Sequence, residues 1–428
     1  MLNQVIHRIL NNHGLLLMMV ITAVNAGNYL LNLVLGRILG PESFSEAGIL
    51  ATLVMVLSFI AVGIQVTAAK YTAELTTSNS ETKMREFHSW IEKQSFISSI
   101  LITLLLIICI PIIKGFLQFE SGWPLFLIFV GIPIYFNLSV RRGFLQGMQS
   151  FRQFSLTYVA EMVGRLLITI PGILIINALG LDLYSEVVSL GFLASFIGAI
   201  LFSGKFKYKP TKTINLPKKA VITFFMIMMC YEGTQIAISY SDVILVKHYF
   251  EDQQAGLYAA LSLLGRIVYF GTWALVMVLV PKVIQKAKQG LPTTQTLIHS
   301  LIIIISFGGV MVITTALIPG FIVGNLLGDE FLPLGDYLWK YALATTLFAA
   351  ANVIAYYYLS LGKYIPVILS AFAGISQVVL IMINHQTILN IINIQLILMS
   401  CLLLGMITYH LINPTQYENR ISYTLSPK

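Results

Sequence analysis

The chain has 428 residues, of which 57% are hydrophobic and only 10% are charged, and its mean hydropathy is +0.83. Globular proteins carry about a quarter charged residues, because polar side chains must cover a large water-facing surface. The composition therefore excludes a soluble enzyme and predicts a membrane protein. The net charge is +8, but the basic residues are scattered between apolar runs. Such scattering is typical of topology signals, so we expect no nucleic-acid partner.

Apolar stretches of about 20 residues, the length that a helix needs to cross the hydrocarbon core, recur along the whole chain. We predict a first set of six spans near 15–36, 45–69, 95–113, 121–140, 154–177 and 184–203. A second set of six is predicted near 220–247, 256–281, 295–320, 337–361, 364–384 and 390–412. The first run lacks the short apolar core and A-x-A site of a signal peptide, so we expect it to be a retained span.

Lysines and arginines divide unequally between the two sides that these spans define. Of the 26, twenty fall on one side, four fall on the other, and Arg165 and Arg266 lie inside spans; Arg141 and Arg142 count among the twenty, in the loop after the fourth span. Cytoplasmic loops carry the excess of positive charge. We therefore expect both termini to face the cytoplasm.

A basic stretch at 205–219 is the only long hydrophilic linker in the middle of the chain. It predicts a cytoplasmic linker between an N-terminal lobe, 1–204, and a C-terminal lobe, 220–428, each with six spans. An even number of spans gives both lobes the same orientation.

Two short echoes relate the predicted lobes. GRILGPESFSEAGIL after the first span resembles VKHYFEDQQAGLY after the seventh, and LQGMQSF resembles LSLGKY, which places Gly147 opposite Gly362. We therefore predict an all-α polytopic membrane protein with about twelve transmembrane helices. The helices would form two pseudo-symmetric six-helix lobes around a central cavity.

Ionisable side chains inside the spans are candidates for function, because a charge near the bilayer centre is costly unless it meets a partner or a cavity. Arg165, Glu232 and Arg266 all fall near mid-membrane and could line one cavity. Arg266 has no carboxylate within four residues, so we expect this lone cation to meet an anionic substrate. Glu161 and Arg165 are four residues apart, a spacing for which a structural ion pair and a substrate role are both expected.

Polar residues on the first and seventh spans leave further alternatives open. Asn25, Asn28 and Asn32 form one stripe, for which contacts between helices are the first expectation and substrate contact the second. Proton coupling and inter-helix hydrogen bonding are both open for Asp242. The candidates for substrate binding are Arg266, Arg165, Glu232, Asn28 and Asn32, and those for ion coupling are Asp242 and Glu161. The three cysteines have no metal-site spacing, so we expect no metal or other cofactor.

Four stretches resemble a known family: LGRILGPESFSEAGIL, RRGFLQGMQSF, SDVILVKHYFEDQQAGLYAALSLLGRIVYF and YYLSLGK. They resemble the polysaccharide-flippase branch of the multidrug/oligosaccharidyl-lipid/polysaccharide exporter superfamily, especially O-antigen-type (Wzx-like) flippases. The resemblance implies a MATE-like fold and a transporter in the bacterial cytoplasmic (inner) membrane. Its implied substrate is an undecaprenyl-diphosphate-linked oligosaccharide, flipped by ion-coupled alternating access, with glycosyltransferases and a glycan polymerase as partners.

Two other functions are weighed against this one. A cation-coupled multidrug antiporter of the same fold stays open, because the mid-membrane charges have both signs. A polytopic glycosyltransferase or ligase is less expected, because every predicted outer loop is short. The sequence contains no GxxxxGK[ST] phosphate loop, so we do not expect transport to be powered by ATP hydrolysis in this chain. Lipid II flippases of the same superfamily generally have fourteen spans, more than this length allows, so we do not expect the chain to have that role.

Overall fold

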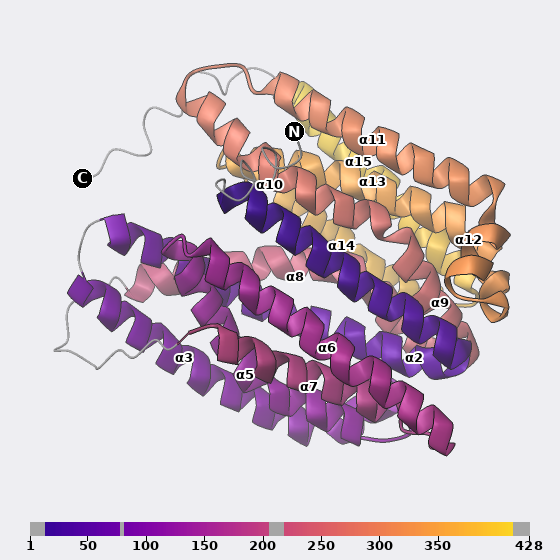
Figure 1. Ribbon diagram of the computed structural model, residues 1–428. Coiled ribbons are helices and arrows are strands. Elements are labelled where there is room, and N and C mark those ends of the chain that lie inside the picture. The colour runs from indigo at the N-terminus through magenta and orange to yellow at the C-terminus, as the bar shows by residue number, and fades with distance from the viewer. Residues whose placement is uncertain (1–12, 78–80, 205–217, 414–428) are drawn as a thin grey trace, which may run out of the picture. The chain divides into compact units, whose positions relative to one another are not determined.

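The computed structural model describes residues 13–77, 81–204 and 218–413, and regular structure within these ranges is entirely helical (Figure 1). The predicted orientation of the termini lies outside the described residues. So does most of the predicted linker 205–219, whose last two residues begin α8. The chain forms two compact units. The lobe boundaries predicted from the sequence stay a prediction.

The first unit comprises Met1–Leu35 and Glu46–Gly233. Its helices are most of α2 (His13–Thr77), α3 (Glu81–Ile108), α4 (Ile110–Phe116), α5 (Trp123–Gly147), α6 (Phe151–Leu179), α7 (Tyr184–Phe202) and the first part of α8 (Lys218–Tyr249).

The second unit comprises Gly36–Ser45 and Thr234–Lys428. It contains the rest of α8, α9 (Asp252–Gly265), α10 (Ile267–Lys288), α11 (Thr294–Leu317), α12 (Pro319–Leu326), the 3₁₀ helix η1 (Asp329–Leu334), α13 (Gly335–Ser360), α14 (Ile365–Ile383) and α15 (Ile388–Ile412). Helix α13 lies at the centre of this unit, in contact with α9, α10, α11, α14 and α15. Its buried alanines, such as Ala349 and Ala351, allow the neighbouring helices to approach closely.

Ten helices of the described ranges are long and apolar enough to cross a membrane. Helix α2 covers the first two predicted spans, and α9 with α10 covers the eighth. The chain therefore has about twelve membrane segments, and the predicted all-α polytopic fold class is confirmed. The two spans of α2 meet at a kink where Gly40 adopts φ 71° and ψ 173°, a conformation open to glycine, directly before Pro41.

The segment Gly36–Ser45 is held within the second unit by polar and close backbone contacts. Lys247 is 1% exposed, forms an ion pair with Asp252 and donates a hydrogen bond to the Ser45 hydroxyl at 3.1 Å. A Cβ atom on Gly256 would overlap the carbonyl oxygen of Pro41. Glycine at this position therefore allows α9 to contact the kinked segment.

Helices α5 and α13 end in the same kind of turn. At the end of α5 the Ser150 N–H donates to the Leu145 carbonyl at 2.8 Å, and at the end of α13 the Lys363 N–H donates to the Tyr358 carbonyl at 2.9 Å. In both turns the residue just before the N–H donor has a positive φ. These residues are Gln149 (φ 58°) and Gly362 (φ 74°). The sequence alignment that paired Gly362 with Gly147 is therefore shifted by two residues. A Cβ atom added to Gly147 would lie 2.6 Å from the Ala69 carbonyl oxygen, so glycine at this position allows α5 to pack closely on α2.

Candidate functional site

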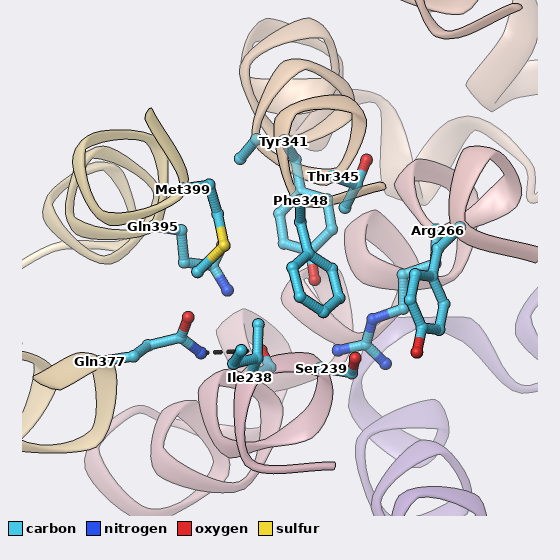
Figure 2. Close-up of a pocket in the computed structure, with 11 residues that line it drawn as sticks. Ile238, Ser239, Arg266, Tyr341, Thr345, Phe348, Gln377, Gln395 and Met399 are labelled. Carbon is cyan, nitrogen blue, oxygen red and sulfur yellow. Dashed lines mark hydrogen bonds between the residues drawn. The ribbon is translucent and has the colours of Figure 1, made fainter. Parts of the chain in front are cut away.

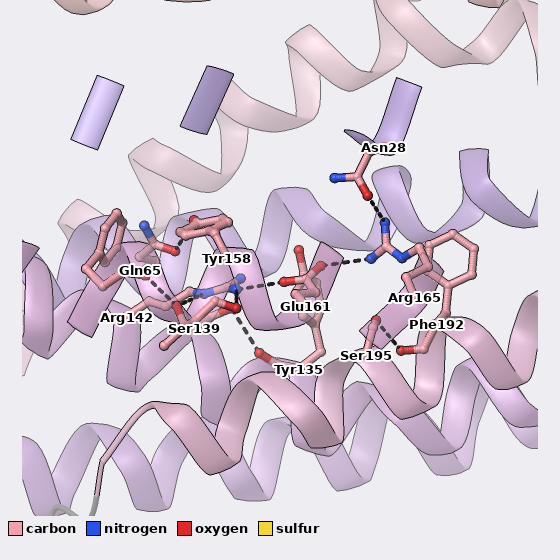
Figure 3. A network of polar contacts seen from close by, with 12 residues as sticks. Asn28, Gln65, Tyr135, Ser139, Arg142, Tyr158, Glu161, Arg165, Phe192 and Ser195 are labelled. Atoms are coloured by element: carbon pink, nitrogen blue, oxygen red, sulfur yellow. Dashed lines mark hydrogen bonds and ion pairs between the residues drawn. The ribbon is translucent and has the colours of Figure 1, made fainter. Parts of the chain in front are cut away.

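In the first unit, Glu161 on α6 lies between two arginines (Figure 3). Its Oε1 accepts a hydrogen bond from Arg165 at 2.8 Å, and its Oε2 accepts one from Arg142 at 2.7 Å. The side chains of Arg165 and Arg142 are only 7% and 3% exposed. Because two cations share one carboxylate, this arginine cluster keeps a formal charge of +1.

Arg142 is the member of the arginine cluster that sequence analysis missed. The prediction placed it in a cytoplasmic loop, which is wrong, because α5 continues to Gly147. Adjacent helical side chains point about 100° apart. Arg141 therefore reaches the end of α7, whereas Arg142 donates to the Thr157 hydroxyl at 3.0 Å and lies 3.7 Å from the ring centre of Tyr158.

Arg165 has a second polar partner and one free donor. Its Nη1 donates to Asn28 Oδ1 at 3.1 Å, and its guanidinium lies 4.2 Å from the ring centre of Phe192. Its Nε is buried without a hydrogen-bond partner among the described residues. Asn32 donates to the Asn28 backbone carbonyl at 2.9 Å and does not contact Arg165 through a hydrogen bond. The predicted ion pair between Glu161 and Arg165 is confirmed, and Asn28 also contacts Arg165.

Glu232 on α8 is a buried carboxylate of the first unit. It is 8% exposed and has no ion pair or hydrogen bond within the part of the chain that the structure describes. Arg165 belongs to the same unit, whereas Arg266 belongs to the other. The shared cavity of these three residues stays a prediction.

In the second unit, Asp242 on α8 is completely buried and accepts hydrogen bonds from three side chains. Arg266 donates to Oδ1 at 3.1 Å, and the hydroxyls of Tyr258 and Tyr341 donate to Oδ2 at 3.0 and 2.8 Å. The expectation that Arg266 is a lone cation is wrong. Its partner is 24 residues away on another helix, so a search within four residues could not find it. This aspartate network is electrically neutral.

The predicted eighth span, 256–281, is interrupted at Arg266, between α9 and α10. A Cβ atom on Gly265 would overlap the ring of Tyr341, so glycine allows α13 to approach here. The Thr345 hydroxyl donates to the Gly265 carbonyl at 2.8 Å, which satisfies a backbone group at the break. Such interruptions are tolerated in membrane helices where other groups complete the backbone hydrogen bonds. The break places Arg266 beside Asp242.

A small cavity of about 30 Å³ lies beside Arg266 (Figure 2). Its lining includes Tyr341, Ser239 and Gln377, and the Gln377 amide donates to the Ile238 carbonyl at 2.9 Å. The Ser239 hydroxyl and Gln377 Oε1 have no partner among the described residues, so one or two waters could bridge them. Pockets for drug-sized ligands measure roughly 300–1,000 Å³. This cavity is therefore too small for a glycan or a drug.

The structure also bears on metal binding. Among the described residues, no group of three or more His, Cys, Asp or Glu side chains could hold a metal ion. The carboxylates of Glu161 and Asp242 instead form ion pairs with arginines.

Comparison with known proteins identifies the family. Residues 10–287 match the family described as polysaccharide biosynthesis protein. The chain therefore belongs to this family, which confirms the resemblance seen in the sequence. No curated protein matches the sequence.

The fold is similar to those of several solved transporters. An inward-facing multidrug resistance MATE transporter of the MOP superfamily matches with a TM-score of 0.78 at 12% identity, over 93% of this chain and 96% of that chain. The lipid II flippase MurJ, in an inward closed conformation, matches with a TM-score of 0.71 at 13% identity, over 92% and 87%. A MOP superfamily transporter from Pyrococcus furiosus matches with a TM-score of 0.65 at 15% identity, over 93% and 94%. At such identities the likeness establishes a shared fold.

Proposed function

We propose that the protein flips an undecaprenyl-diphosphate-linked oligosaccharide across the bacterial inner membrane, for the synthesis of O-antigen or another surface polysaccharide. The observation that supports this most is the uncompensated positive charge of the arginine cluster, Arg142–Glu161–Arg165. A diphosphate cannot cross hydrocarbon without compensation of its negative charge. A buried cluster with an excess of one cation provides such compensation.

The geometry indicates how an anionic head group would bind. Arginine presents planar pairs of N–H donors that suit phosphate oxygens, and Arg165 has an unused Nε donor. Asn28, which already contacts Arg165, offers an amide for a sugar or phosphate oxygen. Glu161 would hold both guanidinium groups in place when no substrate is bound. Arg266 is paired with Asp242, so we assign it a weaker substrate role than Arg165.

Ion coupling would use carboxylates of the spans. Glu232 has no partner in the described part of the chain, so it is available to bind a proton or a metal cation during transport. Asp242 and Glu161 stay candidates, although arginines already neutralise both. The termini would face the cytoplasm, and glycosyltransferases and a glycan polymerase would make and consume the lipid-linked glycan.

A cation-coupled multidrug antiporter is the second candidate function. The unpaired carboxylate of Glu232 favours it, because such a group attracts cationic drugs, and the MATE transporters share the fold. The net positive charge of the arginine cluster opposes it, because a cationic substrate would be repelled there.

Reconstitution of the purified full-length chain in phospholipid vesicles tests the proposal. A fluorescent undecaprenyl-diphosphate oligosaccharide is placed in one leaflet, and a membrane-impermeant glycosidase reports its arrival in the other. The wild-type chain should accelerate flipping, and Arg165→Gln should slow it at least tenfold. Arg85→Gln is the matched control, because Arg85 is 53% exposed and pairs with Glu81 on the surface of α3. Vesicles that accumulate ethidium but leave the lipid unmoved would establish the antiporter instead.

A further inference from the structure

A groove of about 510 Å³ lies between α10 and α11 in the second unit. Within the described part of the chain, it shares no lining residue with the cavity beside Arg266. Its lining includes Leu275, Lys282, Lys286, Thr296, His299 and Ile303. The polar members lie toward the α10–α11 turn.

The polar end of this groove is basic. Lys282 and Lys286 are four residues apart, on one face of α10, and His299 faces them from α11. The Lys286 ammonium donates to the Thr296 hydroxyl at 2.9 Å, which directs this charge across the groove. Among the described residues, no carboxylate lines the groove, so no acidic lining residue there compensates the two lysines. Side-chain amides of Gln285, Gln289 and Gln295 add neutral donors.

The other end of the groove is apolar. Leu275 lies seven residues before Lys282, which places it about 10 Å farther along α10. Ile303 lines the groove from α11 and is 54% exposed, and Ile302 beside it in the sequence is 57% exposed. Hydrocarbon chains can therefore contact α11 directly beside the basic end.

We propose that this groove binds an anionic phospholipid, of the phosphatidylglycerol class, from the leaflet at the α10–α11 turn. The phosphate lies against Lys282 and Lys286, and an acyl chain lies along Leu275 and Ile303. Basic pockets between membrane helices bind anionic head groups in this way. Lysines at this end of α10 belong to the side of the chain that the charge distribution predicts to be cytoplasmic. The inference does not depend on the proposed flippase activity.

Native mass spectrometry of the purified full-length chain tests the site. Phosphatidylglycerol or phosphatidylethanolamine is added to the detergent-solubilised protein, and bound lipid is counted at each concentration. We expect tighter binding of phosphatidylglycerol. Each lysine near a lipid surface contributes about fivefold in affinity, so Lys282→Gln/Lys286→Gln should weaken phosphatidylglycerol binding about 25-fold. Lys218→Gln/Lys219→Gln, at the start of α8, makes the same charge change outside the groove and should leave binding unchanged.

Two further variants separate charge from folding. Lys282 is exposed, so Lys282→Gln alone should fold normally and still weaken binding about fivefold. Lys282→Arg/Lys286→Arg should keep the preference for phosphatidylglycerol. Equal binding of the two lipids, or an equal loss in the Lys218/Lys219 control, would overturn the proposal. Displacement of phosphatidylglycerol by equimolar undecaprenyl phosphate, or by soluble glycerol phosphate, would overturn it as well, because the occupant would then be the carrier lipid or a free phosphate.

Discussion

The two units solve the problem of buried charge differently. The arginine cluster of the first unit shares one carboxylate between Arg142 and Arg165, whereas the aspartate network of the second unit pairs Asp242 with Arg266 alone. The first can lose an arginine and still contain an ion pair. The second cannot lose either charge without leaving the other unpaired. This difference indicates which arginine is available for a substrate.

The two carboxylates differ in exposure, whereas the Arg165 and Arg266 side chains are almost equally buried, at 7% and 9% exposed. The Glu161 side chain is 15% exposed, and Arg165 keeps an unused donor. The Asp242 side chain is 0% exposed and is covered by two tyrosine hydroxyls as well as by Arg266. We infer that the aspartate network primarily stabilises the second unit, whereas the arginine cluster has the excess positive charge and the unused donor that binding of an anion needs.

The largest expected effect is that of Arg266→Gln. It leaves Asp242 as a buried carboxylate without a counterion, which costs about 3–5 kcal/mol. Protein abundance in membranes and the unfolding temperature in detergent should both fall strongly. The double variant Asp242→Asn/Arg266→Gln should recover a large part of the loss, because it leaves no unpaired charge. Normal abundance of the single variant would contradict the structural assignment of this pair.

Glu161→Gln should come second. It leaves two neighbouring arginines without their carboxylate, so we expect a loss of about 3 kcal/mol in unfolding free energy, measured by the same two assays. Glu161→Gln/Arg165→Gln leaves one cation and should be more stable than the single variant. If this double variant is abundant but does not transport, Arg165 contacts the substrate; if it transports, the pair is structural.

Tyr341→Phe should have a smaller effect. It removes one of three hydrogen bonds to Asp242 while keeping the ring against Gly265, so the expected loss is about 1–2 kcal/mol. Thermal unfolding in detergent measures it, with Tyr364→Phe on the exposed start of α14 as the control. A loss as large as that of Arg266→Gln would mean that the tyrosine, and not the ion pair, dominates the network.

Glu232→Gln should have the smallest effect on stability, within about 0.5 kcal/mol, because no partner in the described residues loses a contact. Its effect should lie in transport. The rate of lipid flipping in vesicles should lose its dependence on an imposed proton or sodium gradient. A destabilised variant, or one with an unchanged gradient dependence, would remove Glu232 from the coupling proposal.

Much of the fold could be predicted, because membrane helices must be apolar over a fixed length. The predicted span 184–203 agrees closely with α7, Tyr184–Phe202. Hydropathy could not predict the break at Arg266, which depends on the approach of Tyr341 to Gly265 from a distant part of the sequence. The hydropathy pattern also placed the end of the fourth span at residue 140, because the adjacent Arg141 and Arg142 are typical of a loop.

The candidate site was predictable only where its partners lie on one helix. Glu161 and Arg165 are one turn apart, so their spacing indicated the contact. Asp242 and Arg266 lie on different helices, and only the fact that neighbouring spans tend to pack together could have suggested their pairing. For Arg142, the only indication in the sequence was the adjacent Gly143, since glycine inside a membrane helix often marks close helix packing. A Cβ atom added to Gly143 would lie 2.6 Å from the Gln65 carbonyl oxygen, so this part of α5 packs tightly against α2.

The most direct test of the central claim is equilibrium binding of undecaprenyl diphosphate and of uncharged undecaprenol to the purified chain in detergent. We claim that the excess charge of the arginine cluster binds the anionic head group. Arg165→Gln should therefore weaken undecaprenyl diphosphate binding at least tenfold and leave undecaprenol binding unchanged, while Arg85→Gln alters neither. Unchanged diphosphate binding in Arg165→Gln, or an equal loss for undecaprenol, would contradict the account.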